Sequence, residues 1–185
     1  MSKILAFGAS NSKHSLNKQF AHYVAGQIKG AQTTLIDLKD FDMQLYCIDT
    51  QKEEGFPQKA EAFNKLLEDH DAFIISLAEH NQNYTAVFKN IIDWVSRIDR
   101  KMWRGKPVLL LSTSPGGRGG RNVMDIALKN MSIMGAYIIA DFCLPSFYEN
   151  FKPEGGITNE ELAQEFQPKL NAFIQALAEP KLEQN

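Results

Sequence analysis

Five short and continuously apolar runs, separated by longer amphipathic segments, are the feature that most constrains the fold of this 185-residue chain. The runs lie at residues 3–8, 33–37, 72–77, 107–113 and 137–142. A strand with one face in water alternates apolar and polar residues, whereas a strand covered on both faces is apolar throughout. We therefore expect five strands of a buried parallel sheet.

Between these runs, apolar residues recur every three to four positions, which is typical of helices that bury one face. The expected helices lie at residues 16–28, 60–67, 84–98, 123–134 and 162–177. Thr158 and Glu161 have the spacing of a capping box, and we expect them to start the last helix. Strands that alternate with helices predict an α/β fold whose sheet is covered on both faces.

Composition favours one ordinary globular domain. No linker or internal repeat divides the chain, so we expect a single domain at residues 1–180 and a C-terminal tail at 181–185. The formal net charge of −2 gives no general attraction to nucleic acid or anionic membrane. No signal peptide and no apolar run of ~20 residues is recognisable. Cys47 and Cys143 have apolar neighbours, and we expect buried free thiols and a cytoplasmic protein.

The loop after the first expected strand has the composition of a phosphate site. It reads Gly8-Ala9-Ser10-Asn11-Ser12-Lys13-His14-Ser15-Leu16-Asn17. The hydroxyls of Ser10, Ser12 and Ser15 and the amide of Asn17 add donors to the unpaired N–H groups of a helix start. The loop lacks both the Lys-Ser/Thr ending of a P-loop and the GxGxxG spacing of a dinucleotide fold. It therefore predicts a site for a single phosphate group.

Two further loops, at residues 78–84 and 113–121, are expected at the same edge of the sheet, where α/β proteins bind ligands. The second is polar, and its backbone and amide groups suit the edge of a flat heteroaromatic ring. The third contains Gly116, Gly117, Gly119 and Gly120, which let a planar ligand approach the backbone closely. A phosphate site beside two ring-binding loops suits flavin mononucleotide (FMN).

These three loops resemble those of the NAD(P)H-dependent FMN reductase family of quinone, azo-dye and chromate reductases. Its first loop, Gly-Ser-x-Arg-x-x-Ser-x-Asn, is matched by Ser10, Ser15 and Asn17. Its Pro-Glu-Tyr-Asn loop and the helix that follows are matched by Glu79, Asn81 and the segments 88–90 and 93–97, and its glycine-rich loop by 114–120. This chain has Ser12 in place of the family's arginine, Ala78 in place of its proline and His80 in place of its tyrosine.

The resemblance implies a flavodoxin-like three-layer sandwich with a five-stranded parallel sheet of order 2-1-3-4-5. It implies that hydride passes from NADPH or NADH through flavin N5 to a quinone-like, azo or other small acceptor. The cofactor chemistry needs no catalytic side chain, and no group of residues has metal-ligand spacing. The residues expected to contact FMN are Ser10, Ser12, Ser15, Leu16, Asn17, Ala78, Glu79, His80, Asn81, Ser114, Gly116 and Gly117.

The family forms dimers or tetramers, and the apolar residues within 84–103 exceed what one helix face needs, so we expect a homodimer or homotetramer. Two alternatives remain open. The protein could be a flavodoxin-type electron carrier, although such carriers are strongly acidic and use a threonine-rich phosphate loop. It could also be a non-enzymatic oligomeric relative in which the changes at Ser12, Ala78 and His80 have weakened flavin binding.

Overall fold

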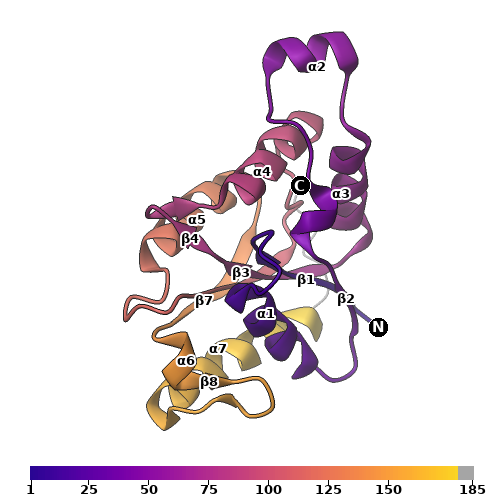
Figure 1. The fold of residues 1–185 in the computed structure, drawn as a ribbon. Helices are drawn as coiled ribbons and strands as arrows, with labels where there is room; N and C mark the ends of the chain where they lie inside the picture. Colours follow the sequence, from indigo (N-terminus) through magenta and orange to yellow (C-terminus); the bar gives the residue numbers. More distant parts are fainter. Residues whose placement is uncertain (179–185) are drawn as a thin grey trace.

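The computed structural model describes residues 1–178, in which a central sheet of five parallel strands is covered by helices on both faces (Figure 1). The strands occur in the order β2-β1-β3-β6-β7, which confirms the predicted order 2-1-3-4-5. Their bounds are β1 Lys3–Ala9, β2 Gln32–Leu35, β3 Ala72–Leu77, β6 Pro107–Thr113 and β7 Tyr137–Leu144. The inner strands β1, β3 and β6 are almost entirely buried, whereas β2 at the edge is partly exposed.

Successive side chains of β1 point to two separate hydrophobic cores. Leu5 and Phe7 pack in the core beneath α3 (Gln58–Asp69), α4 (Ala86–Ile98) and α5 (Arg121–Ile133). Ile4 and Ala6 pack in the core beneath α1 (Leu16–Gly26) and α7 (Glu160–Ala178). A strand between two cores has no polar face, which explains its continuous apolar sequence.

Several short elements were not predicted. They are the 3-10 helix η1 (Leu38–Phe41), α2 (Ile48–Glu54), α6 (Phe147–Asn150) and the hairpins β4 (Glu79–His80) with β5 (Asn83–Tyr84) and β8 (Phe151–Lys152) with β9 (Gly156–Ile157). α2 buries none of its residues, so it has no amphipathic pattern that a sequence could reveal.

Residues 42–57, which we call the arm, carry α2 away from the sheet (Figure 1). α4 holds the base of the arm with two side chains. Asn90 Oδ1 accepts from Tyr46 N at 2.8 Å, and Asn90 Nδ2 and Trp94 Nε1 both donate to Gln44 O, at 3.0 and 2.9 Å. The arm is therefore fixed at its base, whereas α2 buries none of its residues.

Three details of the sequence interpretation are wrong. Thr158 does not cap α7, because its hydroxyl donates to Glu149 O, while Asn159 Oδ1 accepts from Leu162 N at the helix start. Cys47 is exposed because it lies on the arm, and Cys143 is only partly buried. The apolar side chains expected as an interface surplus are fully buried core residues, namely Phe88, Ile91, Trp94, Val95, Met102 and Trp103.

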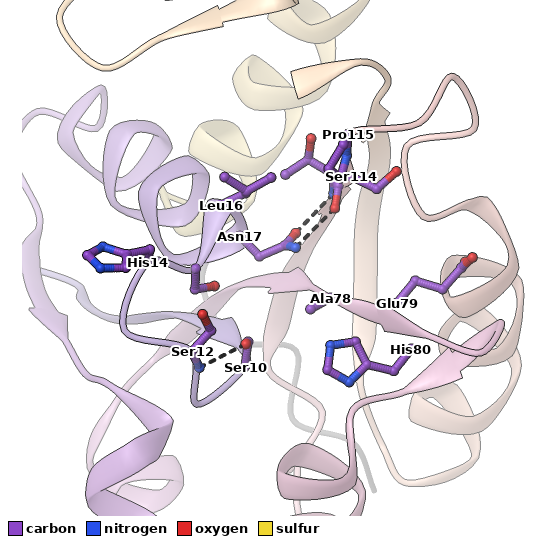
Figure 2. Close-up of a pocket in the computed structure, with 12 residues that line it drawn as sticks. Ser10, Ser12, His14, Leu16, Asn17, Ala78, Glu79, His80, Ser114 and Pro115 are labelled. Atoms are coloured by element: carbon purple, nitrogen blue, oxygen red, sulfur yellow. Dashed lines mark hydrogen bonds between the residues drawn. The ribbon is translucent and has the colours of Figure 1, made fainter. Parts of the chain in front are cut away.

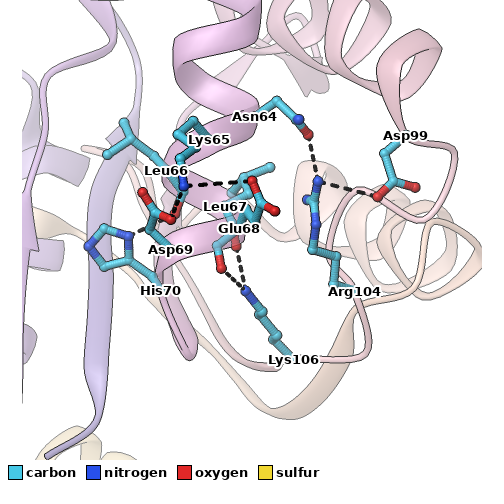
Figure 3. A network of polar contacts seen from close by, with 10 residues as sticks. All are labelled: Asn64, Lys65, Leu66, Leu67, Glu68, Asp69, His70, Asp99, Arg104 and Lys106. Atoms are coloured by element: carbon cyan, nitrogen blue, oxygen red, sulfur yellow. Dashed lines mark hydrogen bonds and ion pairs between the residues drawn. The ribbon is translucent and has the colours of Figure 1, made fainter.

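A polar network joins the end of α3 to the segment before β6 (Figure 3). Lys106 Nζ donates to Leu67 O at 2.6 Å and to Glu68 O at 2.7 Å, and so satisfies carbonyl groups at the helix C-terminus. Arg104 donates to Asn64 Oδ1 at 2.7 Å and pairs with Asp99 at 3.3 Å. Because Lys106 directly precedes β6, this network lies at the amino end of the sheet.

No helix within residues 1–178 is long and apolar enough to cross a membrane. The expected tail at 181–185, like residues 179 and 180, lies outside the described residues.

Candidate functional site

A hollow of about 180 Å³ lies at the carboxyl ends of β1, β3 and β6 (Figure 2). The chain leaves the neighbouring strands β1 and β3 toward opposite faces of the sheet, and this is where α/β proteins commonly bind ligands. The lining residues come from the three loops that the sequence singled out. They are Ser10, Ser12, His14, Ser15, Leu16, Asn17, Ala78, Glu79, His80, Thr113, Ser114 and Pro115.

Among the residues expected to contact FMN, Asn81, Gly116 and Gly117 do not line this hollow. Asn81 lies in the turn of the β4–β5 hairpin, with a φ of 50°. The sequence reasoning missed His14, Thr113 and Pro115, which do line it. Thr113 ends β6 and Pro115 follows it closely, so their place at a strand end was the signal available for them.

The first loop presents hydrogen-bond donors from both side chains and backbone. Ser10 Oγ accepts from Ser12 N and Ser15 Oγ accepts from Lys18 N, each at 3.1 Å. Each hydroxyl thus uses a lone pair and keeps its own proton for another acceptor. Leu16 and Asn17 form the first turn of α1, where N–H groups have no helical carbonyl to bind.

The side chain of Asn17 holds the loop against the sheet. Its Nδ2 donates to Thr113 O at 3.0 Å, and its Oδ1 accepts from Thr113 N at 2.9 Å and from Ser76 Oγ at 2.7 Å. The residue is only 5% exposed. The side-chain amide of Asn17 therefore joins α1 to the ends of β3 and β6.

Lys18 links the first loop to the segment that follows β2. Its Nζ lies 2.8 Å from Asp37 Oδ2, just beyond β2, and donates to Lys13 O at 3.5 Å. Burial acts to raise the pKa of Asp37, but the hydrogen bonds from Lys18 and from Lys39 N outweigh it and lower this pKa below its ordinary value. Asp37 is thus kept ionised by its hydrogen bonds with Lys18 and Lys39.

The second loop contributes His80 to the hollow but turns the carboxylate of Glu79 away from it. Figure 2 shows the ring of His80 pointing from β4 toward the first loop, and Glu79 extending to the opposite side. Glu79 Oε2 accepts from Val123 N at 2.9 Å, and Oε1 accepts from Asn122 Nδ2 at 3.2 Å. The carboxylate thus binds the start of α5, and the rest of the residue borders the hollow.

The third loop is fixed to the end of β7 and to α6. Ser112 Oγ donates to Gly119 O at 2.7 Å, Ser146 N donates to Gly116 O at 3.0 Å and Phe147 N donates to Ser114 O at 3.0 Å. Gly119 has a φ of +58°, and a Cβ there would lie 2.8 Å from the carbonyl carbon of Leu144. A side chain at Gly119 would therefore force the loop away from β7.

The donor set fits the phosphate group of FMN. Three serine hydroxyls and two first-turn N–H groups surround one end of the hollow, and a helix N-terminus favours an anion there. At the other end, the backbone of residues 78–80 and 113–115 borders the space that a ring would enter. The hollow itself is smaller than the ~300–1,000 Å³ of typical small-molecule sites, so a bound flavin would extend beyond it.

The sequence model of a family described as NADPH-dependent FMN reductase matches residues 2–150. A 2-hydroxy-1,4-benzoquinone reductase from Burkholderia sp is 34% identical to this chain over 144 residues, which cover 71% of this chain and 76% of that protein. A quinone reductase from Escherichia coli (strain K12) is 40% identical over 79 residues, which cover 43% of this chain and 42% of that protein.

The fold also has counterparts among solved structures. The flavoenzyme NAD(P)H:(acceptor) oxidoreductase FerB from Paracoccus denitrificans superposes with a TM-score of 0.80, at 22% identity, over 96% of this chain and 98% of that one. This likeness confirms the flavodoxin-like fold, and the family match confirms the predicted class of enzyme, a flavin-dependent oxidoreductase with FMN as cofactor and NAD(P)H as donor. The three loops, their common hollow and the match over residues 2–150 together show that this chain belongs to the NADPH-dependent FMN reductase family.

Proposed function

We propose that this protein binds FMN in the hollow between its three loops and reduces a quinone-like, azo or other small acceptor with NAD(P)H. The observation that carries the proposal is the convergence of the three loops on one hollow at the carboxyl edge of the sheet. The Burkholderia and Escherichia coli relatives are quinone reductases by name, which supports a quinone as the first acceptor to test.

In this proposal the hydroxyls of Ser10, Ser12 and Ser15 and the N–H groups of Leu16 and Asn17 hold the phosphate. Residues 78–81 and 114–117 border the ring. FMN, when bound, supplies the hydride chemistry, and the protein supplies binding and orientation. N–H groups of the second and third loops stabilise negative charge on the ligand without any side chain acting as acid or base.

Ser12 sets the character of the phosphate site. Ser12 stands where the family pattern has an arginine, so the side-chain donors at the proposed phosphate site are neutral. A charge-assisted hydrogen bond, which contributes ~1.5–3 kcal/mol, is therefore absent from this position. We therefore expect FMN to bind more weakly than at an arginine-containing loop. Ser12→Arg should tighten binding about ten-fold or more, since 1.4 kcal/mol corresponds to a factor of ten.

We also propose a cytoplasmic homodimer or homotetramer. The arm supports self-association, because Leu45 is 76% exposed and Ile48 is 43% exposed on a segment that the chain holds firmly at its base. A second copy would cover these side chains, and it could complete a hollow that is small for a flavin. Sedimentation of the wild type and of Leu45→Asp tests this: a wild-type monomer at micromolar concentration contradicts the proposal.

The decisive experiment is the visible spectrum of the purified protein after FMN is added and the excess is removed. Retained flavin bands that NAD(P)H bleaches without oxygen, and that a quinone restores, support the reductase. Ser10→Ala/Ser15→Ala should lose FMN at least ten-fold more readily, whereas Ser132→Ala on α5, far from the first loop in sequence, should not. Bands that NAD(P)H fails to bleach would contradict the proposal and favour an electron carrier.

A further inference from the structure

The carboxylate of Glu79 joins two loops that lie more than forty residues apart in the sequence. Glu79 opens β4 in the second loop, and its two oxygens accept from Val123 N at 2.9 Å and from Asn122 Nδ2 at 3.2 Å. Both partners lie in the first turn of α5, directly after the third loop. Asn122 in turn accepts from Arg118 at 2.8 Å, so the contact continues into the third loop itself.

α5 depends on this contact because it has no cap of its own. Its N-cap residue is Gly120, which has a φ of +82° and no side chain to accept from the first turn. A helix start leaves N–H groups without partners, and a side-chain oxygen normally satisfies one of them. Here Glu79 supplies that oxygen, and its negative charge also suits the positive end of the helix dipole.

The position of the third loop is coupled to the position of the α5 start, which comes directly after it in the chain. Arg118 O accepts from Arg121 N at 3.1 Å, which joins the end of the loop to the helix start, and Gly119 O accepts from Ser112 Oγ at 2.7 Å, which joins the same end to β6. Ser114 and Pro115, at the other end of the loop, line the hollow opposite Ala78 and His80. The spacing between these two walls therefore depends on where Glu79 holds the start of α5.

We propose that Glu79 is a positioning residue that fixes the second and third loops relative to one another, and that its carboxylate does not contact the cofactor. The inference rests on the proposed FMN site for its meaning in function. Its structural part, the coupling of two loops through one carboxylate, rests on protein–protein contacts alone. When the loops are preorganised, less free energy is spent on ordering them as the ligand binds. Glu79 should therefore raise FMN affinity without contacting FMN.

Three substitutions of Glu79 distinguish the effect of side-chain length on FMN affinity from the effect of side-chain charge. Glu79→Ala removes the cap, and Glu79→Asp keeps the charge but is one methylene too short to reach Val123. Glu79→Gln keeps the length, and its carbonyl oxygen accepts from Val123 N. We expect Glu79→Ala and Glu79→Asp to weaken FMN binding about ten-fold and Glu79→Gln to stay within about three-fold of the wild type. If the negative charge decided affinity, Glu79→Asp would bind FMN like the wild type and Glu79→Gln would bind it weakly, which would overturn the proposal.

Hydrogen exchange of the ligand-free protein provides a readout that does not depend on FMN. Glu79→Ala should speed exchange about ten-fold at residues 119–124, while Glu79→Gln restores protection. Glu154→Ala, an exposed glutamate in the β8–β9 turn, should change neither exchange nor affinity. If Glu79→Ala lost affinity with unchanged exchange at 119–124, the carboxylate would contact the cofactor directly and the proposal would be wrong. If the wild type bound no FMN but the exchange pattern held, only the proposed function would fail.

Discussion

The side-chain amide of Asn17 pairs with both backbone groups of Thr113, with Nδ2 at 3.0 Å from its carbonyl oxygen and Oδ1 at 2.9 Å from its nitrogen. The two residues lie 96 positions apart, at the start of α1 and the end of β6. This pair, with Ser76 as a third partner, fixes the first loop to the same edge of the sheet as the other two.

Asn17→Ala should destabilise the protein by about 2–4 kcal/mol, because it leaves the buried N–H and carbonyl of Thr113 without partners. Denaturant unfolding measures this change. Asn171→Ala, on the exposed face of α7, should stay within about 0.5 kcal/mol of the wild type. Equal stability of the two variants would show that water replaces Asn17 without cost.

Gly119→Ala should destabilise the protein by about 2 kcal/mol or more and weaken FMN binding, because the new Cβ would lie 2.8 Å from the Leu144 backbone at a positive φ. Gly117→Ala is a control in the same loop, since nothing lies within 4 Å of a Cβ there. Thermal unfolding should therefore separate the two alanine variants, and an FMN titration of Gly119→Ala measures its loss of affinity. Similar losses from both would argue that the whole loop needs glycine for flexibility.

Asp37 should make stability depend on pH in the acid range. Its pKa in the folded protein lies below its ordinary value of 3.8, because hydrogen bonds from Lys18 and Lys39 outweigh the effect of burial. The folded state therefore binds this proton less readily than the unfolded state. The stabilisation from Asp37 is fully present well above pH 4, and it is lost as the pH falls through the lowered pKa.

Asp37→Asn removes this contribution. The difference in unfolding free energy between wild type and variant should be constant above about pH 5 and should shrink as the pH falls below about 4. Urea unfolding across this range measures it. A difference that stayed constant down to pH 2.5 would mean that Asp37 has no lowered pKa.

Asn90→Ala should free the base of the arm. It removes the hydrogen bond to Tyr46 N and those to Met43 O and Gln44 O, and leaves only Trp94 to hold Gln44. We expect a loss of about 1–3 kcal/mol in stability and faster proteolysis within residues 42–57. Lys89→Ala, at the exposed neighbouring position, should leave the cleavage pattern unchanged.

Lys106→Met should reduce stability without changing the site. It removes the bonds to Leu67 O and Glu68 O at the C-terminus of α3, which should cost about 1 kcal/mol. Because this network lies at the amino end of the sheet, FMN affinity should stay within two-fold of the wild type. This variant therefore tests whether lost affinity in other variants reflects the site or only stability.

The sequence by itself determined the architecture, and it predicted the edge of the sheet at which the candidate site lies. Continuous apolar runs such as 72–77 identify strands because burial on both faces excludes polar residues, and the serines of 10–15 predict an anion site because their donors follow a strand end. Such signals are local, because each pattern is formed by residues that are adjacent in the sequence.

Only the tertiary structure decided what Asn17, Glu79 and Asn90 do. Each is a polar residue in a segment that the sequence marks as functional or helical, yet each side chain binds a partner at least 43 residues away. Contacts of this kind depend on which strand ends and helix starts the folded sheet brings together. The exposed arm and the capping of α5 by Glu79 were unpredictable for the same physical reason, because their hydrogen bonds form between segments that no local pattern connects.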